Sequence, residues 1–174
     1  MDLYQFFITY NKAWTQREAI AFAVIFIPLA AISFVRVRQK KISVWQMVSF
    51  LSLVAYVALI LGSCVFTRNP RGYHSYELEL FWSWKRVAAG SSALLLENLL
   101  NIAMLVPVGV LLPGVWGKRV HWWQALLVGC FISAWIETLQ LFLCRGLFEW
   151  DDMVHNSLGC LLGCLAANLL VDKR

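Results

Sequence analysis

The sequence has 174 residues, of which 60% are hydrophobic and only 14% are charged, and its mean hydropathy is +0.66. Soluble domains are about half apolar and about a quarter charged, so this composition excludes an ordinary water-soluble protein. The formal charge of +5 does not indicate nucleic acid, because the basic residues lie in short connectors between apolar runs, where they set membrane topology. We therefore predict an all-α, polytopic membrane bundle.

The N-terminal segment, residues 2–14, carries apolar side chains at helical spacing. These are Leu3, Phe6, Phe7, Tyr10 and Trp14. Such a pattern predicts an interfacial helix that lies in the headgroup layer. No small-residue cleavage site follows the first apolar run, so we expect that run to stay in the mature protein.

Five further segments are apolar and close to the length of about 20 residues that a helix needs to cross a bilayer. They comprise residues 19–35, 44–66, 93–116, 122–143 and 153–171. Residues 73–84 are rich in Tyr, Trp and Phe, which is typical of a membrane interface. Because no repeat or flexible linker interrupts the chain, we predict a single membrane domain over residues 1–174.

The basic connectors predict the orientation of the five spans. The first and third connectors and the C-terminus are basic, with Arg36, Arg38, Lys40, Lys41, Lys118, Arg119, Lys173 and Arg174. The positive-inside rule puts these segments in the cytoplasm. The N-terminus and the connectors 67–92 and 144–152 should then lie outside, in a multi-pass protein of the cell membrane. The outer segments also carry seven Lys and Arg, so the acidic residues support the orientation as well: the two outer connectors hold Glu77, Glu79, Glu149, Asp151 and Asp152, whereas the inner segments hold only Asp172.

Charged residues inside spans are the strongest functional signal, because a carboxylate near the centre of a span costs roughly 2.5 to 3.5 kcal/mol. Carboxylates and amides share helix faces in three pairs, Glu97 with Asn101, Glu137 with Gln140, and Asp152 with Asn156. Arg68 and Arg145 end the second and fourth spans. At a rise of 1.5 Å per residue, all these residues lie within roughly 10 Å of one membrane boundary. The sequence therefore predicts an outward-facing polar pocket built by four helices.

Structural explanations compete with this interpretation. The amides could serve only as hydrogen bonds between helices, and Glu97 and Glu137 could serve only as ion-pair partners of Arg68 or Arg145. Gly159 and Gly163 are best explained as a close-packing pair, and Glu149 as part of a solvated acidic turn. The five cysteines are best explained as small apolar side chains. The three histidines are scattered, so no metal site is predicted, and no cofactor is identified.

Three ordered motifs resemble the VanZ-like family of bacterial membrane proteins. They are NIAMLVPVGVLLP at 101–113, IETLQ at 136–140 and RGLFEWDDMVHNSLGCLLG from Arg145 onward. A less regular upstream motif matches Arg68 and LELFWSW at 78–84, so the resemblance covers about residues 66–168. This chain has Glu149 where the family usually has Asp, and Leu80 where it usually has Pro. The matched positions are Arg68, Glu97, Asn101, Glu137, Gln140, Arg145, Asp152 and Asn156.

The resemblance implies a link to the cell envelope. The family's founding member is associated with resistance to teicoplanin, a glycopeptide antibiotic that acts on cell-wall precursors outside the membrane. A lipid-linked precursor, a membrane lipid or the antibiotic itself is therefore the expected partner class, and no nucleic acid is expected.

The leading functional hypothesis is a pocket that binds, or chemically modifies, an anionic amphiphile of the envelope. Arg68 and Arg145 would hold its phosphate or carboxylate, and Glu137 and Asp152 are the candidate acid and base. The remaining candidate binding residues are Glu97, Asn101, Gln140, Asp151 and Asn156. We also expect Arg145, Glu137 and Asp152 to meet in one buried network.

Two other classes stay open. A small transporter or channel predicts polar residues through the whole bilayer, whereas here they stop in the outer half. A membrane assembly protein would rely on the glycine pair and the aromatic residues, and would tolerate loss of the carboxylates.

Overall fold

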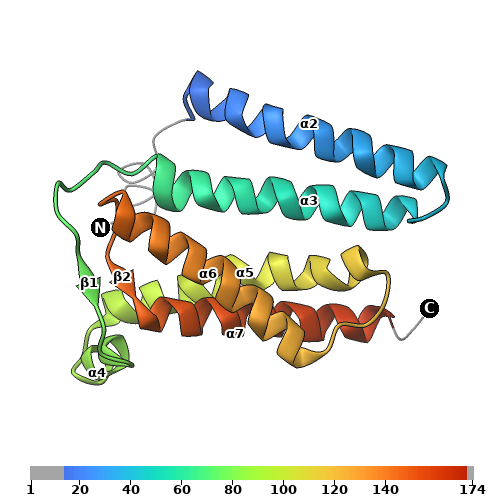
Figure 1. Cartoon of the computed structure of the whole chain (residues 1–174). Coiled ribbons are helices and arrows are strands. Elements are labelled where there is room, and N and C mark those ends of the chain that lie inside the picture. Colours follow the sequence, from blue (N-terminus) through green and yellow to red (C-terminus); the bar gives the residue numbers. More distant parts are fainter. Residues whose placement is uncertain (1–13, 172–174) are drawn as a thin grey trace.

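The computed structural model describes residues 14–171, so the predicted interfacial helix over 2–14 lies outside the described residues except for Trp14. The chain is almost entirely helical (Figure 1). Its long helices are α2 (Gln16–Arg38), α3 (Val44–Leu61), α5 (Ser92–Trp116), α6 (Trp122–Phe142) and α7 (Trp150–Val171). The last turn of α3 widens into a π-helical turn, η1 (Gly62–Phe66). Between η1 and α5 lie the short strand β1 (Tyr76–Glu77) and α4 (Trp82–Ala88), and β2 (Phe148–Glu149) precedes α7.

Five of these helices, with η1 continuing α3, are long and apolar enough to cross a membrane. The prediction of an all-α multi-pass bundle is therefore confirmed. The observed helices extend the predicted first span by three residues at each end and begin the last span at Trp150 rather than at 153. The three extensions are mostly polar or charged residues, which hydropathy alone assigns to connectors.

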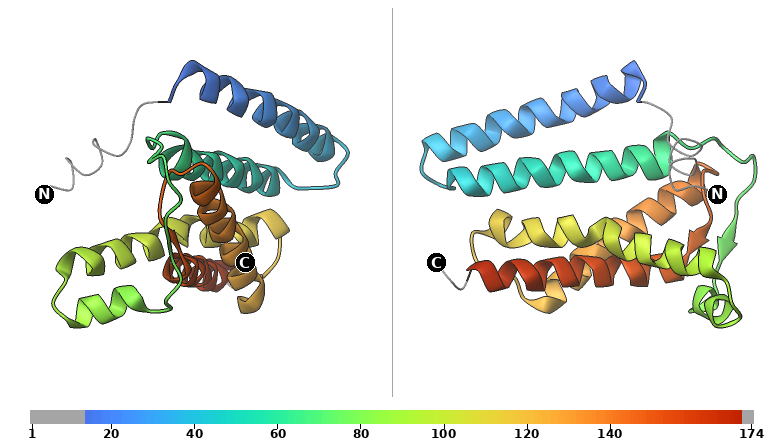
Figure 2. Two further views of the ribbon diagram at one scale, coloured as in Figure 1. Left: turned by 60° about the vertical axis from the view of Figure 1, so that its left-hand side comes forward. Right: turned by 180° about the vertical axis from the view of Figure 1, so that it is seen from behind.

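The helices form two groups (Figures 1 and 2). α2 and α3 make an antiparallel hairpin, and α3 packs against α5. α5, α6 and α7 form the larger group, in which α6 runs obliquely across the other two. α2 contacts mainly α3, and its many exposed apolar side chains, such as Val24 and Ile27, suit contact with lipid.

α5 and α7 lie against each other at backbone distance, because glycines remove the side chains between them. A Cβ atom on Gly159 would lie 1.8 Å from the carbonyl oxygen of Ile102, and one on Gly163 would lie 2.1 Å from that of Val106. Gly109 of α5 makes the reciprocal contact with Cys160. The predicted close-packing role of Gly159 and Gly163 is confirmed.

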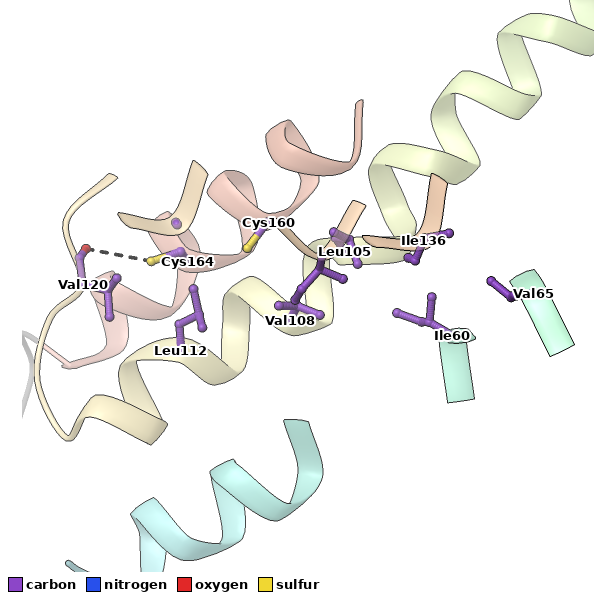
Figure 3. Close-up of a cluster of buried hydrophobic side chains, with 11 residues drawn as sticks. Ile60, Val65, Leu105, Val108, Leu112, Val120, Ile136, Cys160 and Cys164 are labelled. Carbon is purple, nitrogen blue, oxygen red and sulfur yellow. Dashed lines mark hydrogen bonds between the residues drawn. The ribbon is translucent and has the colours of Figure 1, made fainter. Parts of the chain in front are cut away.

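The hydrophobic core follows the α5–α7 contact along the bundle (Figure 3). Leu105, Val108 and Leu112 of α5 are almost completely buried against Cys160 and Cys164 of α7. Both thiols pack among aliphatic side chains, as predicted for small apolar residues. Ile136 of α6, Ile60 of α3 and Val65 of η1 extend this cluster toward the end of the bundle that carries β1 and β2.

Exposed aromatic side chains mark both ends of the bundle. Trp45, Trp116, Trp122 and Trp123 are exposed at the end where α3 and α6 begin and α5 stops. Tyr73, Tyr76, Phe81, Trp84 and Trp150 are exposed at the opposite end. Two such belts are typical of the two interfaces of a bilayer.

Candidate functional site

A pocket of about 180 Å³ lies at the end of the bundle next to β1 and β2. It is lined by residues of four separate helical segments and by the turns that join them. The charged and amide side chains that line it are Arg68, Arg71, Glu97, Asn101, Glu137, Gln140, Glu149, Asp152 and Asn156. The structure thus brings together seven of the nine candidate residues selected from the sequence.

Glu137 lies on the buried face of α6, with 2% of its surface exposed. Its Oε2 accepts a hydrogen bond of 3.0 Å from the backbone N–H of Glu149, just before α7. This bond joins the end of α6 to the start of α7 across the short turn. Glu137 is therefore held in place by backbone, which fixes the carboxylate at the pocket wall.

Asp152 is held by an amide from another helix. Its Oδ1 accepts a hydrogen bond of 2.5 Å from Asn101 Nδ2 of α5. One turn further along α7, Asn156 Nδ2 donates to Ser133 Oγ of α6 at 2.8 Å, while Asn156 Oδ1 is buried and has no partner. The helices α5, α6 and α7 are thus joined by polar side chains beside the pocket, and the Oδ1 of Asn156 remains as an acceptor without a partner.

Glu149 lies in the pocket wall, which corrects its assignment to a solvated turn. It is 9% exposed, and its Oε1 accepts a hydrogen bond of 2.8 Å from Trp82 Nε1. Burial, together with the nearby charges of Asp152 and Glu97, raises the pKa of Glu149 from 4.5 to about 8, against the opposing effect of the Trp82 bond. At neutral pH this side chain is mostly a neutral acid that can donate a hydrogen bond.

Arg68 is the arginine that reaches the acidic side chains of the pocket. It lies two residues after the end of η1, is within electrostatic reach of Glu137 and Asp152, and lines the pocket. Its Nε atom is buried and has no hydrogen-bond partner. Arg71 lines the same pocket from the loop, and its backbone N–H donates to Cys144 O at 2.7 Å.

Arg145 is placed differently from the prediction, which had it meeting Glu137 and Asp152. Its guanidinium Nη1 donates to the carbonyl oxygens of Phe66, at 2.5 Å, and Val65, at 3.4 Å. These carbonyls belong to the C-terminal turn of η1, where the helix dipole favours a cation. Arg145 does not line the pocket, so this part of the predicted network is wrong.

Asp151 is also outside the pocket wall. Its carboxylate is 1% exposed and accepts hydrogen bonds from Phe81 N, Ser83 N and Ser83 Oγ, at 2.5, 3.1 and 2.6 Å. These groups form the start of α4, which begins after Phe81 in a left-handed conformation with a φ of 61°. Asp151 therefore caps α4 and fastens it to α7. Through this cap it places Trp82, the partner of Glu149.

Sequence reasoning missed Arg71 and Glu149 as pocket residues. Glu149 had a signal, since it stands at an acidic position of the third motif, although a lone acid in a turn is usually solvated. Arg71 had no such sequence signal, because it lies in an irregular loop.

Three further residues line the pocket. Glu97 has an exposed side chain at its rim, and the sulfur atoms of Cys64 and Met104 lie 3.6 Å apart in its wall.

The pocket combines two arginines, four acidic side chains and three amides. Within residues 14–171, no group of three or more His, Cys, Asp or Glu side chains is arranged to hold a metal ion. Arginine recognises phosphate and carboxylate oxygens, and a buried acid can donate or take up a proton. The arrangement can therefore hold an anionic group and transfer protons to it.

Comparison with known protein families gives a match over most of the chain. The family model described as VanZ/LLP1 matches residues 53–171, which include every residue that lines the pocket and leave α2 outside. Comparison with the curated proteins and with the solved structures finds no match.

Proposed function

The chain belongs to the VanZ/LLP1 family, and on this premise we propose that its pocket binds the anionic headgroup of an amphiphile of the cell envelope. A lipid-linked cell-wall precursor or a glycolipid has the required chemistry. The observation that carries the proposal concerns Arg68, which lines the pocket and whose buried Nε has no hydrogen-bond partner.

An unpaired buried donor is costly, by about 1 to 3 kcal/mol for a neutral group and more for a charged one. An anionic oxygen in the pocket would accept from Arg68 and remove this cost. Arg71, on the same pocket wall, supplies a second cation. Two arginines on one small pocket suit a phosphate or carboxylate better than a neutral ligand.

The acidic residues of the pocket are compatible with an anion when they are protonated. Glu149, with its pKa of about 8, would donate a hydrogen bond to the ligand at neutral pH. Glu137 and Asp152 face the same space and are the candidates for general acid or base if the headgroup is also modified.

A channel or transporter has less support. Beyond the pocket, along the bundle, the interior is filled by Leu105, Val108, Leu112, Cys160 and Cys164. The backbones of α5 and α7 touch in the same region, at Gly109 and Gly163. An ion or polar solute would have to cross this close-packed apolar contact.

The proposed orientation puts the pocket at the outer face of the cell membrane, where glycopeptide antibiotics meet their target. We propose that a bound precursor headgroup links the protein to teicoplanin susceptibility. Expression of the protein in a susceptible Gram-positive host should then raise the inhibitory concentration of teicoplanin, and the Arg68→Gln variant should not.

The direct test measures lipid binding to purified protein in neutral detergent by native mass spectrometry. The probes are dioctanoyl phosphatidic acid, dioctanoyl phosphatidylglycerol and, as a zwitterionic comparison, dioctanoyl phosphatidylcholine. The parent protein should bind the anionic lipids more tightly than phosphatidylcholine. Arg68→Gln should weaken that binding about tenfold or more, the worth of one charge-assisted hydrogen bond.

Arg86→Gln is the matched control, because Arg86 is exposed on α4 at the same end of the bundle and does not line the pocket. Its binding should stay within about twofold of the parent, since an exposed charge contributes little. Equal binding of anionic and zwitterionic probes, or equal losses in the two variants, would contradict the proposal.

A further inference from the structure

We infer that Arg145, Gln140 and Gly146 are positioning residues that hold η1 in its wide form and thereby direct Arg68 into the pocket. This inference rests on the proposed function, because it assigns these residues to the same anion-binding site. It gives the three residues a role that is exerted through Arg68, and for Gln140 this role is additional to its place in the pocket wall.

The wide turn matters because it determines the direction of Arg68. Residues 62–66 form a π-helical turn, in which Thr67 N donates to Gly62 O five residues back at 2.9 Å. A π turn inserts one extra residue into a helix. Each residue of an α-helix turns the chain by about 100°, so a return of η1 to α geometry would rotate Arg68 away by about that angle.

The carbonyl groups of this turn are all satisfied by specific partners. Beyond the Gly62 bond, Thr67 Oγ1 donates to Ser63 O at 3.3 Å and Gln140 Nε2 donates to Cys64 O at 3.1 Å. Arg145 takes the last two carbonyls, those of Val65 and Phe66. Gln140, near the end of α6, and Arg145, just after it, thus replace the hydrogen bonds that the widened helix cannot make.

Gly146 gives Gln140 the space to do this. A Cβ atom on Gly146 would lie 2.5 Å from Gln140 Oε1 and 2.7 Å from Gln140 Cδ. A side chain at 146 would therefore push the amide out of its bond with Cys64. Arg145 and Gly146 therefore both stabilise η1: Arg145 binds its carbonyl groups directly, and Gly146 leaves room for Gln140 to do so.

A second contact supports the turn at its first residue. The indole of Trp14 lies against Gly62, where an added Cβ would come within 2.6 Å of the ring. The first residue of η1 is thus covered by Trp14, while its last residues are held by Arg145, which follows α6. The turn is fixed between two parts of the chain that are far apart in sequence.

The test is a double-mutant cycle on anionic lipid binding, with the dioctanoyl phosphatidic acid probe and purified full-length protein. Arg68→Gln, Arg145→Gln and the double variant are compared with the parent. If Arg145 acts only through Arg68, Arg145→Gln should weaken binding about as much as Arg68→Gln, and the double variant should bind no more weakly than Arg68→Gln alone. Losses that multiply in the double variant, or parent-like binding by Arg145→Gln, would overturn the inference.

Gly146→Ala is the second variant, and it tests the same inference if Arg145→Gln does not fold. It keeps both arginines and should still weaken binding at least threefold, with no further loss in the Arg68→Gln background. Parent-like binding by folded Gly146→Ala would overturn the role of Gly146 and Gln140. If Arg68→Gln itself binds like the parent, the proposed function fails, so the two failures are distinguishable.

Discussion

At the residue scale, side chains of the same type have different roles in and around the pocket. Arg68 lines the pocket, whereas Arg145 satisfies backbone carbonyls of the neighbouring turn. Asp152 faces the pocket, whereas the adjacent Asp151 caps α4. The difference lies in which backbone groups each side chain can reach, because a buried polar group takes the nearest partner that satisfies it.

The raised pKa of Glu149 predicts how stability changes with pH. The folded protein binds the Glu149 proton up to about pH 8, whereas an unfolded chain releases it near pH 4.5. This contribution to stability is therefore complete below about pH 4.5 and is lost as pH rises through about 8. The thermal unfolding midpoint in detergent should fall between pH 6 and pH 9, and Glu149→Gln should reduce that fall.

The comparison between parent and variant isolates Glu149 from the other acids of the pocket. Gln keeps the shape of the side chain and an oxygen that can accept from Trp82 Nε1, so its effect should be confined to the titration. A midpoint that rises with pH, or an identical slope in the two proteins, would show that Glu149 does not hold its proton in this way.

At the scale of elements, the contact between α5 and α7 determines where the pocket lies. Asn101 of α5 meets Asp152 of α7 because the two helices run parallel in contact. Gly159, two turns after Asp152, lies against Ile102, the residue next to Asn101. A wider separation of the helices would break the Asn101–Asp152 bond of 2.5 Å.

Enlarging Gly159 should therefore separate the two helices. A Cβ at 159 would lie 1.8 Å from Ile102 O, and because that oxygen belongs to backbone, one helix would have to move. Overpacking of this kind costs typically about 1 to 3 kcal/mol. Gly159→Ala should lower the thermal unfolding midpoint in detergent and reduce the yield of folded protein on size-exclusion chromatography.

Ala166→Leu is the matched control for this change, because Ala166 is exposed on the same helix. It adds more volume than Gly159→Ala but meets lipid or detergent rather than backbone, so the midpoint should stay within error of the parent. Equal effects of both changes would argue that α5 and α7 do not touch at Gly159.

At the scale of the whole molecule, the bundle is asymmetric along its axis. The pocket, β1, β2 and α4 lie at one end, and the basic connectors lie at the other (Figure 1). The two aromatic belts are consistent with a membrane between these ends. The charge asymmetry leads us to propose that the pocket end faces outward and that the connectors face the cytoplasm.

Cysteine labelling tests this orientation. In a background in which all five native cysteines are replaced, Arg86→Cys should react with a membrane-impermeant maleimide in intact cells, and Lys118→Cys should react only after permeabilisation. Both positions are exposed, one on α4 and one between α5 and α6. The opposite pattern would place the pocket in the cytoplasm and remove the proposed link to glycopeptides.

The sequence by itself determined the helices and the end at which the polar residues gather. Five long apolar runs have only one stable form in a bilayer, because a spanning segment must satisfy its backbone internally. The sequence alone identified Glu137 and Asp152 as candidate site residues, because the free-energy cost of an acidic residue in a membrane depends only on its type and its depth. The motifs also identified the family.

Only the tertiary structure decided which polar residue meets which partner. We predicted Arg145 in the pocket, but the structure places its guanidinium against the carbonyls of Val65 and Phe66. We predicted Glu149 in a solvated turn, but the structure places it in the pocket wall. The physical reason is that these roles depend on backbone groups brought close by folding, such as the widened turn η1 opposite the end of α6. The spacing of residues along the chain does not predict that η1 and the end of α6 come into contact.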